Sequence, residues 1–145
     1  MKKTVTLSIR GQQSYAEQDP DVIELVTEGT LEAIDDGWSL SYEESDLTGL
    51  EGVNTTFQVQ GKTVTLIRSG KLNSKMVFQE GIPHDSLYQM EFGALMLTVC
   101  ATKVETDLTD TGGTIDLKYN IEVEQNAAGM IEYHLDIQTK KVRDD

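Results

Sequence analysis

The sequence has little of several features that would narrow its function. It contains one cysteine, two prolines and two histidines among 145 residues, and 6% of the residues are aromatic. The single cysteine, Cys100, excludes an internal disulfide and suits a reducing compartment. Two histidines without ligand-spaced partners argue against a metal or haem site, so we expect no cofactor. No run approaches the roughly 18 apolar residues that a membrane-spanning helix needs.

Basic residues are also scarce, with 12 Lys and Arg against 25 Asp and Glu, which gives a net charge of −13. Such a surface repels phosphate backbones and anionic lipid headgroups, so nucleic acid and membranes are poor candidate partners. A cationic partner stays open, although a solvated acidic surface explains the same charge. Near the N-terminus, Val5, Leu7 and Ile9 alternate with polar residues, which is strand patterning rather than a signal peptide. We therefore expect an acidic cytoplasmic protein.

Catalytic signatures are missing as well. The motifs GxSxG, GxGxxG and the phosphate-binding loop do not occur. Adjacent acidic residues such as Glu43 and Glu44 would point to opposite faces of a strand, so they cannot face one another as a general acid and base. Cys100 has no histidine nearby in the sequence to act as its base. We place His134 on a solvated charged face and His84 in a loop, and we expect no enzymatic activity.

Alternation of apolar and polar residues with a period of two dominates what is present. Residues 115–123 and 131–137 show it clearly, and a helical period is almost absent. The second expected strand is long enough to need a bend or bulge, for which Gly29 is the natural place. The expected strands span about 3–12, 21–35, 38–45, 53–59, 64–68, 75–81, 84–89, 92–106, 115–123 and 131–138.

This series predicts an all-β fold of nine or ten short antiparallel strands joined by hairpin-length connections. A chain of 145 residues suits a single domain over 1–145. The strand spacing fits a sandwich or an up-and-down barrel. Sequential hairpins favour a single antiparallel up-and-down β-barrel of about 8–10 strands, because a closed ring has no exposed edge strand. The apolar faces would then line the inside of the ring.

Several segments resemble a known family in their order and spacing. They are YEES, TGLEG, NTTFQVQGKTVTLIRSG, SKMVFQEG, YQMEFGALMLTVCATKV and LKYNIEV, between about Tyr42 and Tyr133. This succession resembles the YwiB-like proteins, which are small uncharacterised bacterial proteins with a calycin-like, lipocalin-shaped β-barrel. MEFG at residues 90–93 stands where that family would have a turn like TPYG. The resemblance implies a fold and no reaction, and the lipocalin GxW signature is absent, because Gly37 and Trp38 are adjacent.

One pair of charges falls on the apolar faces. Glu44 follows Trp38, Leu40 and Tyr42 by alternation, and Arg68 follows Val64 and Leu66. Their strands run in the same direction, so both charges lie at the same end of the barrel, about 10 Å apart at the backbone. We predict that they pair, because an unpaired inward charge is costly. Tyr42, Thr55 and Tyr119 are candidate hydrogen-bond partners. The pair is either a polar anchor for a ligand carboxylate or phosphate, or a structural plug.

Two functions follow from the inward residues. The first is a barrel that binds a small apolar or amphipathic ligand in its interior. The second is a protein-interaction module whose core is filled and which has no such ligand. A homodimer is compatible with either function. A barrel of this size can hold one ligand or fill its interior with side chains. The candidate ligand-binding residues are Arg68, Glu44, Tyr42, Trp38, Phe57, Phe78, Tyr119 and Tyr133.

Overall fold

In a computed structural model of the protein, residues 2–14, 21–44, 51–90, 93–123 and 126–139 are described. They form ten strands, as the alternation predicted, and within these ranges there is no helix long and apolar enough to cross a membrane. The strands are β1 (Lys2–Ser14), β2 (Asp21–Ile34), β3 (Gly37–Glu43), β4 (Val53–Gln60), β5 (Thr63–Gly70), β6 (Asn73–Phe78), β7 (Pro83–Met90), β8 (Gly93–Thr109), β9 (Gly112–Val123) and β10 (Asn126–Thr139).

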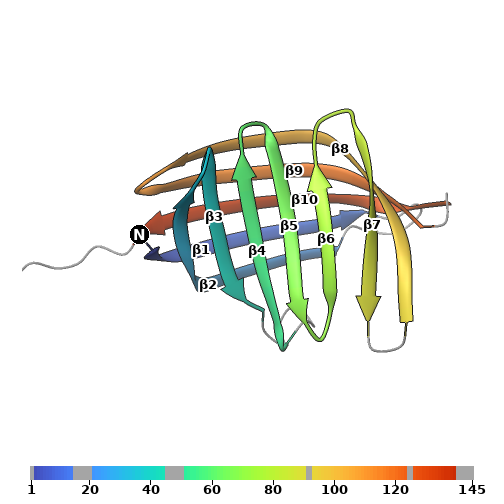
Figure 1. Ribbon diagram of the computed structural model, residues 1–145, viewed down its shortest axis with the longest axis horizontal. Coiled ribbons are helices and arrows are strands. Elements are labelled where there is room, and N and C mark those ends of the chain that lie inside the picture. The colour runs from blue at the N-terminus through green and yellow to red at the C-terminus, as the bar shows by residue number, and fades with distance from the viewer. Residues whose placement is uncertain (1, 15–20, 45–50, 91–92, 124–125, 140–145) are drawn as a thin grey trace, which may run out of the picture.

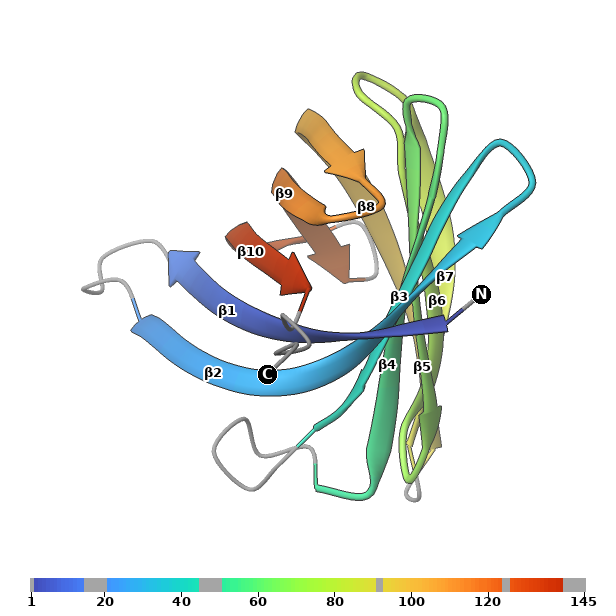
Figure 2. The same ribbon diagram turned by 90° about the vertical axis from the view of Figure 1, so that its left-hand side faces the viewer.

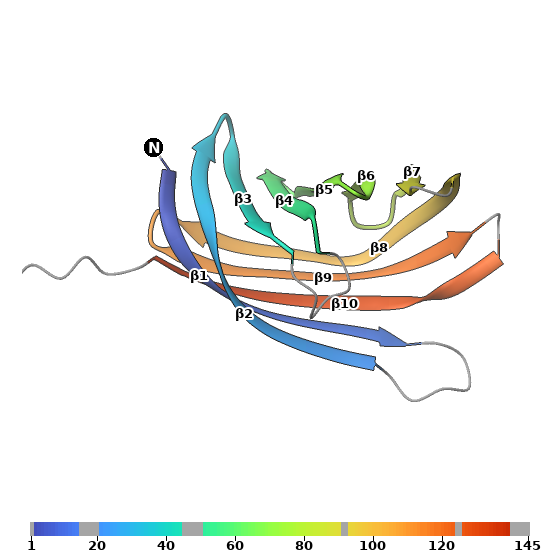
Figure 3. The same cartoon turned by 90° about the horizontal axis from the view of Figure 1, so that it is seen from below.

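The strands form a closed antiparallel barrel in which chain neighbours lie side by side and β1 closes the ring against β10. The expected all-β, up-and-down arrangement is confirmed. The shorter strands β3 to β7 make one wall, which crosses steeply over the long strands β8, β9, β10, β1 and β2 (Figure 1). Viewed from below, the two walls face one another along the length of the barrel (Figure 3).

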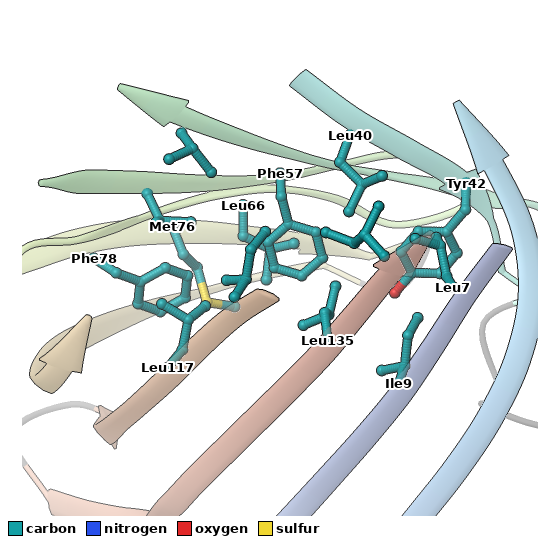
Figure 4. Packing of buried hydrophobic residues seen from close by; sticks show 14 of the residues in the cluster. Leu7, Ile9, Leu40, Tyr42, Phe57, Leu66, Met76, Phe78, Leu117 and Leu135 are labelled. Atoms are coloured by element: carbon teal, nitrogen blue, oxygen red, sulfur yellow. The ribbon is translucent and has the colours of Figure 1, made fainter. Parts of the chain in front are cut away.

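The core fills the space between these walls. Leu40, Phe57 and Leu66 extend from the shorter strands toward Leu117 and Leu135 on the long strands (Figure 4). All five are at most 2% exposed. Burial of such side chains stabilises the fold by roughly 1.5–3 kcal/mol each relative to exposure. The interior beneath the middle of the walls is therefore packed with side chains.

In the long strand β8, the positions that face the interior change by one residue partway along the strand. Leu97, Val99 and Ala101 are buried as expected, but the register with β9 shifts between Ala101 and Lys103. The alternation predicted for this strand therefore holds as far as Ala101, where the bulge interrupts it. The bulge rotates the following residues by one position, so that Val104 packs against the core.

The ring is closed unevenly beside β2. Residues 21–28 of this strand pair with β1, but β3 pairs only with Gly29–Ile34. Figure 2 shows β2 curving away from β3 beyond this point. The register with β1 continues through Gly29, so this position has no bulge, and it is the residue at which pairing with β3 begins. A β-carbon at Gly29 would come within 2.7 Å of the Ser41 carbonyl oxygen, so glycine allows the close approach of the two strands.

Candidate functional site

A two-lobed cavity lies at the end of the barrel where β1 ends and β2 begins, and we call it the mouth. Each lobe has a volume of about 260 Å³. The lobes lie next to one another, because both are lined by Gln13, Arg68, Tyr88, Ile131 and Tyr133. Ligand pockets typically measure about 300–1,000 Å³, a range that the joined lobes reach and a single lobe does not.

The two lobes differ in character. The first lobe, toward β1 to β3, adds polar and acidic groups, among them Gln12, Asp21 and Glu44. The second lobe, toward β8 to β10, adds aliphatic side chains and no acidic residue. Those aliphatic residues are Met76, Leu95, Leu97, Ile121 and Met130. The first lobe also includes Ile9, Ile23 and Leu25, so the mouth joins a side with both acidic and aliphatic groups to an apolar side across the shared Arg68.

Arg68 and Glu44 meet at the floor of the mouth, as the alternation predicted. Arg68 Nε lies 3.9 Å from Glu44 Oε2, and the two side chains are 10% and 2% exposed. The strand register explains this contact. Thr55 on β4 lies opposite both Tyr42 on β3 and Arg68 on β5, and Glu44 follows Tyr42 by two residues on the same face. Thr55 Oγ1 donates a hydrogen bond of 2.6 Å to Glu44 Oε2. Within the described residues, Arg68 Nε is buried and has no hydrogen-bond partner.

Tyrosines surround this pair. Burial, followed by the nearby Glu44 carboxylate, raises the pKa of Tyr42, whose hydroxyl also hydrogen-bonds Glu44. Burial raises the pKa of Tyr119. Burial alone would lower the pKa of Arg68, but Tyr133, through charge and a hydrogen bond, Tyr119 and Glu44 outweigh it, so the pKa is raised. Arg68 therefore stays charged at every physiological pH.

The other predicted site residues divide into two groups. Tyr42 and Tyr133 line the first lobe, and Tyr119 and Tyr133 line the second. Phe57 and Phe78 are 2% and 0% exposed within the core, and Trp38 packs against that core partly buried. None of these last three residues lines either lobe of the mouth.

Sequence reasoning missed several mouth residues. Gln13 and Ile131 line both lobes, and Leu95 lines the second while remaining 39% exposed. The alternation within their strands placed Ile131 and Leu95 on apolar faces. It does not show at what depth along the barrel a residue lies. Glu91 and Phe92, in the MEFG segment, lie outside the described residues.

The outer wall carries a second polar cluster. His134 Nδ1 donates a 2.6 Å hydrogen bond to Asp116 Oδ1 from the neighbouring strand, and Asp136 lies 3.7 Å from Nε2. The hydrogen bond to Asp116 raises the pKa of His134. His134 is 45% exposed on the charged face, as predicted, and its pairing with Asp116 is an additional feature that the sequence did not show. His84 lies in β7 rather than in a loop, with Nε2 3.1 Å from Gln79 Oε1.

Replacement of Thr55 by valine tests the support beneath Glu44. The variant loses the 2.6 Å bond to a buried carboxylate while keeping the shape of the side chain. We expect the free energy of unfolding to fall by about 1.5–3 kcal/mol, measured by urea denaturation. Thr56→Val, on the opposite face of the same strand, is the matched control and should change it by less than about 0.5 kcal/mol. Equal effects of the two variants would contradict a structural bond at Thr55.

Comparison with known proteins agrees with this geometry. The chain is 31% identical over 122 residues to the uncharacterized beta-barrel protein YwiB of Bacillus subtilis (strain 168), covering 82% of each sequence. The crystal structure of the ywiB protein from Bacillus subtilis matches the fold with a TM-score of 0.85 at 24% identity, covering 97% of this chain and 94% of that one. The resemblance seen in the sequence is thereby confirmed. Residues 7–142 match the model described as domain of unknown function DUF1934, and the chain belongs to that family.

Proposed function

We propose that the protein binds a small amphipathic molecule in the mouth of its barrel. The observation that carries the proposal is the position of Arg68, a charged side chain that is 10% exposed and lines both lobes. A polar group of the ligand would accept a hydrogen bond there. Its apolar part would lie against the aliphatic side chains of the second lobe.

The proposal also covers the architecture of the barrel, its location in the cell and its lack of enzymatic activity. A closed antiparallel barrel that is packed in the middle and hollow at one end supports a calycin-like architecture in a single domain. We take the protein to be a cytoplasmic, non-enzymatic binder. Its net charge of −13 supports a role away from nucleic acids and membrane surfaces.

Anilinonaphthalene sulfonate tests the proposal, because it is amphipathic, carries one negative charge and becomes fluorescent in apolar surroundings. We expect saturable binding to the wild type and an affinity at least about tenfold lower for Arg68→Met/Glu44→Gln, which removes both charges together. Val26→Ala, at a residue on β2 that lines neither lobe, should bind as the wild type does. Dye binding that is absent, or that is the same in all three proteins, would overturn the proposal.

Native mass spectrometry of protein purified from cells adds an independent measurement. A mass above that of the chain, lost on denaturation and absent from the double variant, is the expected result. A co-purified molecule retained equally by the double variant would place the ligand elsewhere on the barrel and contradict the assignment of the mouth.

Exposed apolar side chains on the outer wall favour a second candidate, a protein-interaction module. Val22 and Val26 of β2 are 47% and 69% exposed, and the cross-strand partners Leu87 and Met96 are 44% and 52% exposed. Surface patches of this kind mark protein contacts when they are contiguous. Under this candidate, Val26→Asp or Met96→Asp would change sedimentation of the protein, as expected for a homodimer, while mouth variants would not.

A further inference from the structure

The chemistry of the two lobes narrows the class of ligand, on the assumption that the proposed function is correct. Among the described residues that line the mouth, Arg68 is the one basic residue, whereas Glu44 and Asp21 both line its first lobe. Glu44 Oε2 lies 3.9 Å from Arg68 Nε, beyond hydrogen-bond distance, and is held there by Thr55. The Arg68 guanidinium also lines both lobes, so it can interact with the head of a ligand without displacing Glu44.

Charge limits what the head of that ligand can carry. A ligand head group with one negative charge, placed against Arg68, would be attracted by the guanidinium. The acidic side chains lie farther away and would repel it more weakly. A second charge would have no further cation, and it would face Glu44 at close range with little intervening water. A phosphate monoester carries about −1.5 to −2 at neutral pH, so it meets this repulsion, whereas a carboxylate does not.

Both lobes offer aliphatic side chains to the tail of a ligand, but the second has no acidic residue among its described lining residues. The second lobe is lined by flexible or aliphatic side chains, of which Leu95 and Met130 are 39% and 37% exposed at its rim. Such surface gains free energy when it is covered by a hydrocarbon chain, at roughly 25 cal/mol per Å². Methionine side chains adapt readily to an unbranched tail.

We infer that the mouth selects a monocarboxylate with an aliphatic tail: the carboxylate lies on Arg68, the tail occupies the lobe between β8 and β10, and Glu44 and Asp21 reject a second negative charge. This assigns Glu44 a role in selecting the ligand, in addition to its place in the buried pair.

Three probes with the same tail test the assignment: octanoate, octyl phosphate and octylammonium, each titrated into the protein by calorimetry. We expect the wild type to bind octanoate at least about tenfold more tightly than either other probe. Asp21→Asn, at the exposed rim, and Glu44→Gln, at the floor, should each improve octyl phosphate relative to octanoate, with the larger gain for Glu44→Gln. Asp21→Asn keeps the test decisive if Glu44→Gln fails to fold.

The tail is tested separately by Met130→Asp, which places a charge on the rim of the second lobe. We expect this variant to bind octanoate about tenfold more weakly or worse. Val26→Asp adds the same charge at a residue outside both lobes and should change the affinity by less than about twofold. Equal effects of the two aspartates would show that net charge alone governs binding and would overturn the assignment of the tail.

The outcomes separate this inference from the proposed function. If octyl phosphate binds as tightly as octanoate, and both depend on Arg68, the mouth binds amphiphiles but the charge limit is wrong. Tightest binding of octylammonium would overturn the assignment of the head to Arg68. If no probe binds, while the dye also fails to bind, the inference and the proposed function fall together.

Discussion

Replacing Phe78 by alanine is expected to lower the free energy of unfolding by about 3–5 kcal/mol. The side chain is 0% exposed, and its ring centroid lies 4.5 Å from that of Tyr119 across the barrel interior. Removal of the ring loses its burial and leaves a cavity that the crossing walls cannot easily close. Since domains are typically stable by about 5–15 kcal/mol, this single change removes a large share of the stability. Urea denaturation followed by circular dichroism measures it.

Val26→Ala is the control for this prediction, because Val26 is 69% exposed and its truncation should change the free energy of unfolding by at most about 0.5 kcal/mol. A loss below about 1 kcal/mol for Phe78→Ala would mean that the interior is loosely packed at this depth. The ligand cavity would then extend inward from the mouth, and Phe78 would return to the set of ligand-binding candidates.

The second large effect is expected for Arg68→Met. This variant leaves the Glu44 carboxylate, 2% exposed, with Thr55 and Tyr42 as donors but without the adjacent cation. Loss of one partner from a buried pair costs about 3–5 kcal/mol, because the remaining charge stays desolvated. The expected result is therefore a drop of that size in the free energy of unfolding, measured by urea denaturation.

The double variant Arg68→Met/Glu44→Gln should recover at least half of that loss. The glutamine oxygen can still accept the Thr55 hydrogen bond, and no uncompensated charge remains. A complete cycle with Glu44→Gln alone separates the interaction of the pair from the individual costs. If the two single effects add without coupling, Arg68 and Glu44 are each solvated independently, and the pair neither stabilises the barrel nor shapes the mouth.

The sequence predicts much of this molecule because period-two alternation is a strong physical signal. Inward positions such as Leu40 and Leu66 are buried as the pattern indicates, and the same pattern placed Arg68 beside Glu44. Alternation shows which face a residue occupies and leaves its depth along the barrel open, since depth depends on strand tilt and stagger. For that reason Phe57 was grouped with Tyr133, although the structure places the former in the core and the latter at the mouth.

The alternation also does not predict which residues of neighbouring strands lie opposite one another. The hydrogen bond between His134 and Asp116 depends on the register of β9 and β10, which alternation does not fix to a single residue pair. The bulge after Ala101 and the early parting of β2 from β3 likewise depend on how the closed ring must curve. These are consequences of tertiary closure, and no local segment encodes them alone.

The pairing of β1 with β10 constrains how the chain can fold while it is being synthesised. Val5 lies opposite Thr139, so the last seam of the ring joins the strand of the barrel that is synthesised first with the strand that is synthesised last. Contacts so distant along the chain form slowly, and until then β1 has only β2 as a neighbour. A nascent chain stalled before β10 would thus carry two unfinished seams, on β1 and on β9, and would depend on chaperones to stay soluble.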